Sequence, residues 1–409
     1  MTYRPITQNE TPLVADIQAR AFRQPADRYL ESYGGRGRMG WQDLRMLTDE
    51  QGQAAAALGV FSRKMSLNGS ELVAGLVGGV AVPPDLRRRG HGRRLMAGLL
   101  AELRARQVPV SLLFPFSVAW YRSLGYGMAN YAWRLDLPPD LLPEFPERLD
   151  VRRAGPDDES GIRDCYAASR RARANNGWLS RTDWEWENRL QKEGSWERMV
   201  YEVDGRIEGY VVVDLAWSPT ESTARVMEWV WLSDAAWRGL AATLGSLSEQ
   251  ARLLRYNAPR HDPLLHSLRE PYDFANAPVE FVFFQSARLL SGFMLRVVDL
   301  PAALRQRVYP AGVETEFVLH VEDAQIPDNN RPLHVRVAGG AAQTLPLSTD
   351  LRHPTVQIGI SSFSEMYAGL VSARQLRLMG RLVADDTTCA ALTAVFAAAP
   401  LHMWPADWF

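Results

Sequence analysis

The chain is poor in cysteine and in patterns that bind metal. Only two cysteines occur among its 409 residues, Cys165 and Cys389, and they lie far apart. So few cysteines without a CxxC pair are typical of a reducing compartment and exclude a cysteine-based metal site. The seven histidines show none of the spacing with carboxylates that metal motifs have. We therefore expect no catalytic metal.

The chain also lacks an excess of charge and any long hydrophobic run. It has 46 basic and 47 acidic residues and a net charge of -1, so no overall field favours nucleic acid as a partner. No segment approaches the ~18 to 20 apolar residues that a membrane helix needs, and Met1–Pro5 lacks the hydrophobic core of a signal peptide. We expect a cytoplasmic protein without a membrane span.

The length and the 46% hydrophobic content indicate two or three domains. Helices and strands are both expected along the chain, which predicts a mixed α and β fold. In the first part, periodicity predicts a helix over residues 7–22, strands over 54–61 and 72–82, a helix to about 106, and a buried strand over 108–114. A short helix that ends at a glycine follows within residues 117–127.

The most informative stretch is an apolar strand that runs through a basic, glycine-bearing turn into a helix. Free backbone N–H groups and the positive end of the helix dipole meet at such a turn, which suits a phosphorylated cofactor. Glycines there let phosphate oxygens approach the amides. The predicted cofactor-binding residues are Val80, Ala81, Val82, Arg87, Arg88, Arg89, Gly90, His91, Gly92 and Arg93.

Each part of this pattern also has an ordinary structural explanation. Many strand-to-helix turns need glycine for a positive φ angle, and a run of arginines is often a solvated face. The combination is more specific, because Leu95, Leu99 and Leu103 follow in the same register. Their spacing places them on one buried face of the helix.

At these residues the sequence resembles the GNAT acyltransferases, whose acetyl-coenzyme A motif is a strand followed by Arg/Gln-x-x-Gly-x-Gly/Ala. Arg87, Gly90 and Gly92 match this motif position by position. The resemblance implies that backbone amides near Val80 and Val82 hold the pantetheine arm and the thioester carbonyl of acetyl-coenzyme A.

Two further parts follow. In the second, two strands over residues 200–214 flank Asp204-Gly205, a type I′ hairpin signal. A strand over residues 226–232 then passes into a helix at Ser233-Asp234, which places a carboxylate where the first part has arginine and glycine. We interpret it as a second GNAT-like domain without a cofactor site. The third part, from about Phe293, begins with a strand and a short helix over residues 295–308. It predicts an α+β domain with further strands over 317–321, 333–337 and 356–360 and helices over 364–373 and 387–397.

The whole chain resembles the enhanced intracellular survival (Eis) family, in which two GNAT domains precede a sterol carrier protein-like domain. On this basis we expect domains at residues 1–148, 149–290 and 291–409. The resemblance implies a homohexamer. It also implies that Tyr121 is the general acid and that the α-carboxylate of Phe409 is the general base.

The predicted reaction is acetyl transfer from acetyl-coenzyme A to an amine by direct attack in a ternary complex, since no cysteine lies near either motif. An acceptor ammonium has a reference pKa near ~10, so a base must remove its proton first. Backbone N–H groups near Val80 would stabilise the oxyanion, and Tyr121 would protonate the departing thiolate. Aminoglycosides, polyamines and peptide lysines all remain candidate acceptors.

Several alternatives stay open at this point. Tyr121 could be an ordinary core tyrosine, with Tyr126 as the acid instead, and Phe409 could be a hydrophobic plug. Asp27, Glu31 and Asp407 are candidate groups for binding a cationic acceptor. From a different functional class, the chain could be a noncatalytic protein that binds a lipid or another apolar ligand in its third domain.

Overall fold

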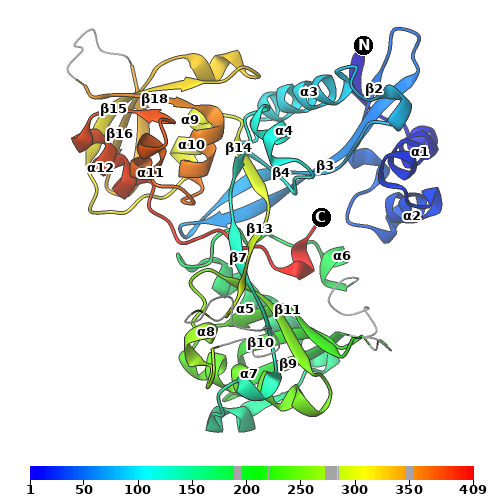
Figure 1. Ribbon diagram of the computed structural model, residues 1–409, viewed down its shortest axis with the longest axis vertical. Helices are drawn as coiled ribbons and strands as arrows, with labels where there is room; N and C mark the ends of the chain where they lie inside the picture. Colours follow the sequence, from blue (N-terminus) through cyan, green and yellow to red (C-terminus); the bar gives the residue numbers. More distant parts are fainter. Residues whose placement is uncertain (188–195, 217, 219–220, 272–282, 284, 347–352) are drawn as a thin grey trace. The chain divides into compact units, whose positions relative to one another are not determined.

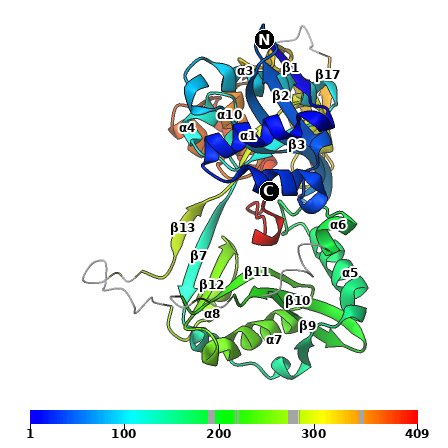
Figure 2. The same ribbon diagram turned by 90° about the vertical axis from the view of Figure 1, so that its right-hand side faces the viewer.

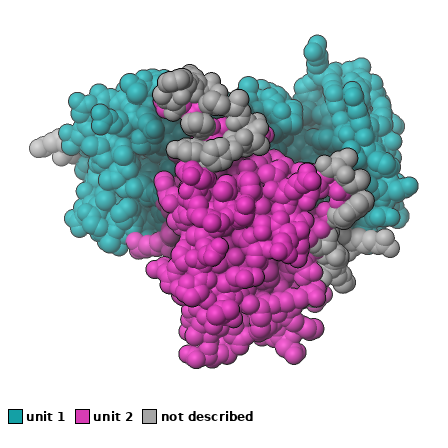
Figure 3. Space-filling model, turned by 60° about the horizontal axis from the view of Figure 1, so that its bottom comes forward, with its two compact units in different colours: residues 1–130, 292–398, 409 teal, residues 131–291, 399–408 magenta. Residues whose placement is uncertain are grey.

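The computed structural model describes residues 1–187, 196–216, 218, 221–271, 283, 285–346 and 353–409. The chain divides into two compact units (Figure 3). Unit 1 comprises Met1–Asn130, Gly292–Ala398 and Phe409, and unit 2 comprises Tyr131–Ser291 and Ala399–Trp408. Helices pack on sheets in both units, so the expected mixed α and β fold is confirmed (Figure 1).

The first sheet of unit 1 has seven strands in the order β1-β2-β3-β4-β5-β14-β6. Their bounds are β1 Thr2–Pro5, β2 Leu44–Thr48, β3 Ala54–Leu67, β4 Ser70–Ala81, β5 Val110–Leu113, β14 Met294–Val297 and β6 Gly127–Met128. β3 and β4 form a long antiparallel hairpin, and β4 pairs in parallel with β5. All four residues of β5 are buried, as the apolar run predicts.

Strand β14 completes this sheet from a distant part of the sequence. It pairs antiparallel with β5 on one side and with β6 on the other. The sequence pattern places this strand at the start of the third domain, because a pattern of apolar residues does not reveal which sheet edge a strand joins. The third part of the chain thus contributes directly to the first sheet.

Helices α1 (Thr11–Phe22), α2 (Ala26–Glu31), α3 (His91–Ala105) and α4 (Val118–Arg122) accompany the first sheet (Figure 1). α1 and α3 both pack against β3 and β4. The side chains of Leu95, Leu99 and Leu103 are fully buried, which confirms the predicted apolar face of α3.

The remainder of unit 1 is a second sheet with helices beside it (Figure 1). Its order is β17 (Ala341–Leu345), β16 (Leu333–Ala338), β15 (Thr315–Glu322), β18 (Thr355–Gly359) and β19 (Leu382–Val383). The helices are α9 (Leu300–Gln306), α10 (Ile360–Tyr367), α11 (Ala373–Leu378) and α12 (Asp386–Val395).

The helix predicted over residues 364–373 is α10, which starts four residues earlier and ends at Tyr367. Strand β18 ends at Gly359, and the helix begins at the next residue without a loop. Ile360 is apolar and buried. An apolar residue is compatible both with the end of a buried strand and with the start of a buried helix, so the sequence pattern does not mark this boundary.

Unit 2 contains one sheet of seven strands in the order β13-β7-β12-β11-β10-β9-β8. Their bounds are β13 Arg288–Ser291, β7 Tyr131–Leu137, β12 Leu253–Pro259, β11 Thr223–Trp231, β10 Arg206–Asp214, β9 Trp196–Val203 and β8 Val151–Arg153. Helices α5 (Glu159–Arg170) and α7 (Asp234–Gly245) pack on it (Figure 2), and α6 (Asp183–Glu185) and α8 (Leu264–Ser267) are short.

The turn between β9 and β10 confirms the hairpin expected at Asp204-Gly205, since both residues have positive φ angles, 51° and 74°. Strand β7 lies within the span predicted for the first domain, yet it pairs with β12 and β13 in unit 2. Among the described residues, no helix is long and apolar enough to cross a membrane.

Candidate functional site

The site is built where β4 and β5 separate. Their parallel pairing runs from Ala74 opposite Val110 to Val77 opposite Leu113 and stops there, within the part of the chain that the structure describes. β4 continues to Ala81 while remaining paired to β3 on its other edge. The edge of β4 that faces away from β3 is therefore without a strand partner beyond Val77, which leaves backbone groups available to a ligand.

A cavity of about 660 Å³ lies at the end of β4 and the start of α3. Phe22, Phe116 and Trp120 contribute aromatic surface to it. All but one of the predicted cofactor-binding residues line it: Val80, Ala81, Val82, Arg87, Arg88, Gly90, His91, Gly92 and Arg93. Arg89 lies outside this lining and instead borders a second cavity with Asp49 and Arg94.

The start of α3 leaves its amides accessible. Gly90 precedes the helix with φ +81°, and neither a side-chain cap nor an acidic residue occupies the first turn. A Cβ added at Gly90 would meet nothing within 4 Å, so the space beside its backbone is open. An open cradle at a helix N-terminus fits the phosphate groups of a nucleotide-type ligand.

The arginines of the turn divide into two groups. Arg87 donates to the carbonyl oxygens of Val82 and Ala21, at 3.3 and 3.2 Å, and thereby links the turn to α1 and to the residue that follows β4. Arg93 donates to the hydroxyl of Ser123 at 3.0 Å. Among the described residues, the exposed Arg88 makes no hydrogen bond or ion pair to protein, which leaves its guanidinium for an anionic ligand.

Gly92 and His91 have structural explanations as well. A Cβ at Gly92 would lie 3.3 Å from the ring of Trp120 and 3.6 Å from the side chain of Val82, so close packing already favours glycine there. His91 is buried, and burial followed by the charges of Arg94 and Arg89 lowers its pKa. The imidazole is therefore neutral at neutral pH and adds no charge to the turn.

The two tyrosines considered as the general acid differ in their hydrogen bonding. Tyr126 is fully buried, and its hydroxyl lies 2.8 Å from that of Ser111. Tyr121 is 2% exposed and packs on Trp120, yet its hydroxyl has no hydrogen-bond partner among the described residues. Burial raises the pKa of both phenols, that of Tyr126 to about 12, so both are protonated at neutral pH.

Phe409 lies in unit 1 beside the gap between β4 and β5. Its ring contacts Phe61 of β3, with ring centroids 5.8 Å apart, and Phe114 just after β5, at 5.4 Å. Its carboxyl carbon lies 4.0 Å from the position that a Cβ of Gly78 would take. No basic side chain forms an ion pair with this carboxylate within the described residues.

No sequence pattern predicts the groups that hold the residues before Phe409 in unit 2. The carboxylate of Asp407, 1% exposed, accepts two hydrogen bonds from Arg181 at 2.8 Å and one from the hydroxyl of Tyr166 at 3.1 Å. Arg181 also pairs with the buried Glu228, which accepts from Tyr210 as well. These five residues form the buried Arg181 network.

Asp407 therefore cannot bind a cationic acceptor as expected, because its charge is already compensated and shielded from solvent. No local pattern could reveal the network, since its members come from five separate segments. Asp27 and Glu31 lie on α2 and are exposed, so they remain candidates for the acceptor side.

In the corresponding turn of unit 2, a side chain of the turn itself caps the helix. Ser233 precedes α7, and its hydroxyl accepts a hydrogen bond from the backbone of Ala236 at 3.2 Å. Asp234 adds a negative charge to the first turn. A phosphate there would compete with the serine cap and meet a like charge.

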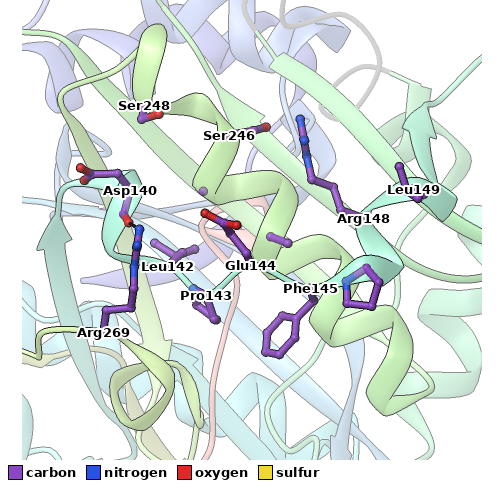
Figure 4. A pocket seen from close by; sticks show the side chains of 13 residues that line it. Asp140, Leu142, Pro143, Glu144, Phe145, Arg148, Leu149, Ser246, Ser248 and Arg269 are labelled. Carbon is purple, nitrogen blue, oxygen red and sulfur yellow. Dashed lines mark hydrogen bonds between the residues drawn. The ribbon is translucent and has the colours of Figure 1, made fainter.

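Unit 2 has a separate cavity of about 620 Å³, formed by the chain around residues 140–149 and the end of α7 (Figure 4). Its charged side chains have both signs, with Asp140 and Glu144 as well as Arg148 and Arg269 labelled in Figure 4. Arg269 donates to the backbone carbonyl of Asp140. This mixed lining lacks the glycine-arginine turn that distinguishes the cavity of unit 1.

Three domain families match the chain. Residues 2–129 match an acetyltransferase (GNAT) domain, residues 177–297 match a second acetyltransferase (GNAT) domain, and residues 300–404 match a sterol carrier protein domain. An uncharacterized N-acetyltransferase from Streptomyces griseus is 27% identical over 379 residues, which cover 84% of this chain and 83% of that protein. Another, from Streptomyces avermitilis, is 24% identical and covers 88% and 87%.

Solved structures share the fold over the full chain. A GCN5-related N-acetyltransferase from Anabaena variabilis aligns with a TM-score of 0.86 and 22% identity, covering 100% of both chains. One from Kribbella flavida aligns at 0.82 and 24%, covering 100% of this chain and 98% of that one. Eis1 from Mycobacterium abscessus aligns at 0.77 and 19%, again over 100% of both chains.

These matches confirm the expected arrangement of two GNAT domains followed by a sterol carrier protein-like domain. They also identify the protein as an acyltransferase enzyme of the GNAT type, for which acetyl-coenzyme A is the implied donor. A purely noncatalytic binding protein is therefore not retained as an alternative.

Proposed function

We propose that this GNAT acyltransferase is an Eis-type N-acetyltransferase that transfers the acetyl group of acetyl-coenzyme A directly to an amine. The observation that carries the proposal is the place of Phe409. Its carboxyl carbon lies 4.0 Å from the Cβ position of Gly78, beside the strand edge that β5 leaves unpaired. The cavity at the β4–α3 turn adjoins the same strand at Val80.

Groups of unit 1 would bind the acetyl donor, acetyl-coenzyme A. The accessible amides at the start of α3 and the guanidinium of Arg88 would hold the phosphate groups of acetyl-coenzyme A. Backbone N–H groups of β4 beyond Val77 would orient the thioester and stabilise negative charge on its carbonyl oxygen. Acetyl-coenzyme A supplies the activated acetyl group.

Tyr121 is the proposed general acid. Its burial keeps the phenol protonated, and its hydroxyl is not used by another side chain among the described residues. The hydroxyl of Tyr126 is instead bonded to Ser111. Tyr121 is thus the better placed of the two to give a proton to a leaving thiolate.

The α-carboxylate of Phe409 is the proposed general base. A carboxylate with a reference pKa of roughly 3.5 is ionised at neutral pH. Since no basic side chain pairs with it in the described part of the chain, its charge would attract an ammonium and accept a proton from it. The ring contacts with Phe61 and Phe114 hold the residue in place and do not use the carboxylate.

The acceptor is proposed to be a cationic amine, with aminoglycosides, polyamines and peptide lysines as the classes to compare. Exposed Asp27 and Glu31 on α2 supply negative charge in unit 1 that could favour such a molecule. A hexameric assembly and a cytoplasmic location remain predictions from the Eis resemblance.

The proposal is tested by separating the ring of Phe409 from its carboxylate. Thiol release from acetyl-coenzyme A is measured with each amine class for four proteins: the unchanged chain, Phe409→Leu, the chain without residue 409, and the chain extended by one glycine. A base at the terminus predicts that Phe409→Leu keeps most activity. Deletion and extension both lose at least ~100-fold in kcat, which is the usual contribution of a general base, while the KM for acetyl-coenzyme A stays within about twofold.

If deletion and extension retain full kcat, the carboxylate is not the base. If Phe409→Leu loses as much activity as deletion does, the residue acts through the packing of its ring, as a hydrophobic plug. Tyr121→Phe and Tyr126→Phe are compared in the same assay. Activity that survives the first substitution and disappears with the second would make Tyr126 the acid.

A further inference from the structure

A cluster of three potential metal ligands lies in the second sheet of unit 1, outside the site described above. Glu316, His334 and His353 each offer one ligand atom, and these atoms all lie within 4.8 Å of one another. The histidines show no metal-type spacing in the sequence, because these ligands come from three different strands or strand ends.

The register of the sheet brings the three residues together. Glu316 lies on β15, and His334 lies on the neighbouring β16 opposite Val318. On the other side of β15, the parallel pairing of Val318 with Thr355 in β18 places His353 level with Glu316. The buried residues Phe317 and Leu319 alternate with Glu316 and Val318, so the cluster lies on the face opposite the apolar core.

The geometry is close to that of a metal-binding triad. An imidazole nitrogen of His334 (Nε2) lies 3.1 Å from a carboxylate oxygen of Glu316, and Nδ1 of His353 lies 3.9 Å from the same oxygen. The two imidazole rings have centroids 4.2 Å apart. Ligand bonds of about 2.0 to 2.1 Å in a tetrahedron require donor atoms roughly 3.3 to 3.5 Å apart. This separation lies within the range of the three ligand atoms, from 3.1 Å to at most 4.8 Å.

The donor set selects the kind of ion. Two imidazole nitrogens and one carboxylate oxygen suit Zn²⁺ and its first-row neighbours, whereas Ca²⁺ and Mg²⁺ prefer oxygen ligands alone. His334 is the most enclosed member, with 6% of its side chain exposed, while Glu316 and His353 are about one-third exposed at 35% and 32%. A metal ion can therefore reach the triad from solvent.

Arg336 is the charged group that competes with a metal ion here. Its Nε lies 3.4 Å from the other carboxylate oxygen of Glu316, Oε1, and its own side chain is 55% exposed. The oxygen that faces both histidines is Oε2, so the arginine and a metal ion would use different oxygens of one carboxylate. The arginine offsets the charge of Glu316 without occupying the place between the imidazoles.

We propose that Glu316, His334 and His353 form a binding site for one Zn²⁺ ion. Three protein ligands leave a fourth tetrahedral position for water. The ion links β15 to β16 and to His353, which precedes β18. Its role is therefore to stabilise the pairing of these strands. The site is independent of the proposed acetyl transfer, since it shares no residue with the cavity at the β4–α3 turn.

The test uses the full chain without a histidine tag, stripped of metal with a chelator. Zn²⁺ is titrated against a chromophoric competitor, and Co²⁺ is added separately to read tetrahedral coordination from its visible absorption. The proposal expects one Zn²⁺ per chain and a higher unfolding temperature with Zn²⁺ than with Mg²⁺.

Glu316→Gln, His334→Gln and His353→Gln are each expected to weaken Zn²⁺ binding by at least ~100-fold, since loss of an outer-shell partner alone costs 10- to 100-fold. The matched control is His320→Gln, which changes another histidine of β15 and is expected to bind as the unchanged chain does. Circular dichroism of the metal-free variants checks that each one folds.

The proposal is overturned if the unchanged chain binds no stoichiometric Zn²⁺. It is also overturned if the three variants bind as tightly as the unchanged chain, or if His320→Gln loses binding equally. Acetyl transfer by His353→Gln is expected to match that of the unchanged chain, so this result does not depend on the proposed function.

Discussion

The strand-to-helix turns of the two units follow the same order of elements but treat their helix amides in opposite ways. Between β4 and α3, Gly90 leaves the helix start without a side-chain cap and with open space beside its backbone. Between β11 and α7, the hydroxyl of Ser233 accepts a hydrogen bond from the first turn and Asp234 adds negative charge. The same local topology can thus leave its helix amides open to a ligand or cap them with its own side chain. Two or three residues decide which of these occurs.

The arginines of the two units also differ in whether they are available to a ligand. Arg88 of unit 1 is exposed and makes no ion pair among the described residues, whereas Arg181 of unit 2 is 2% exposed and pairs with two buried carboxylates. A charge left in solvent contributes little to folding and remains available to bind. A charge buried with its partners stabilises the fold only while every partner is present.

The largest effect is expected from breaking the buried Arg181 network. Arg181→Met would leave Glu228 and Asp407 buried without a counter-charge, which costs about 3 to 5 kcal/mol of unfolding free energy. Urea denaturation measures this change. Arg173→Ala, at an exposed arginine of the same unit, is the control and should stay within ~0.5 kcal/mol. Equal stability of the two variants would show that the buried carboxylates do not need Arg181.

Removing Arg88 should affect binding and not folding. A hydrogen bond to a charged group contributes about 1.5 to 3 kcal/mol, so Arg88→Ala is expected to raise the KM for acetyl-coenzyme A at least tenfold. Its urea midpoint should match that of the unchanged chain. Arg89→Ala is the matched control, since Arg89 lies outside the lining of the cavity and should change KM less than twofold. A larger effect from Arg89→Ala would reassign the binding arginine.

Acid should destabilise unit 2 through His402. Burial, followed by the charge of His261, lowers the pKa of His402 to about 3, and neither ring nitrogen has a hydrogen-bond partner in the described part of the chain. The unfolded state takes up a proton near pH 6.5 while the folded state does not. Stability is therefore lost as pH falls from about 6.5 towards 3, at up to about 1.4 kcal/mol per pH unit.

His402→Asn should remove this component of the pH dependence. The measurement is the unfolding free energy of both proteins in urea at several pH values between 4 and 7. A slope in this range that is identical for the two proteins would show that the ring titrates alike in the folded and unfolded states.

The smallest effect concerns the cap of α7. Ser233→Ala removes a side chain that accepts a hydrogen bond from Ala236, which is expected to cost ~1 kcal/mol of stability. The KM for acetyl-coenzyme A should not change, because this turn is not expected to bind it. Ser233→Gly, which costs only a few tenths of a kcal/mol at an N-cap, is the control. A change in KM with either variant would argue that unit 2 also holds the donor.

Local patterns predicted the elements around the site well. Apolar runs indicated β4 and β5, and the spacing of Leu95, Leu99 and Leu103 indicated the buried face of α3. These features depend on residues close together in the sequence. The same holds for the hairpin at Asp204-Gly205, whose turn is encoded by its own two residues.

Features that join distant segments could not be predicted in this way. The insertion of β14 beside β5, the buried partners of Arg181 and the grouping of Glu316 with two histidines all depend on pairing between remote strands. Asp407 illustrates the consequence, since its sequence context gave no sign that Arg181 compensates its charge. Only the resemblance to a family suggested a role for Phe409, whose neighbours Phe61 and Phe114 are far from it in sequence.

The position of β14 implies an order of events during synthesis. β5 and β6 emerge from the ribosome long before β14, with all of residues 131–291 translated in between. At a translation rate of 5 to 20 residues per second, this interval is on the order of ten seconds. During it, β5 and β6 lack the strand that lies between them in the first sheet. A fragment that ends at residue 130 would lack β14 permanently, and the unpaired edges of β5 and β6 would be prone to aggregation.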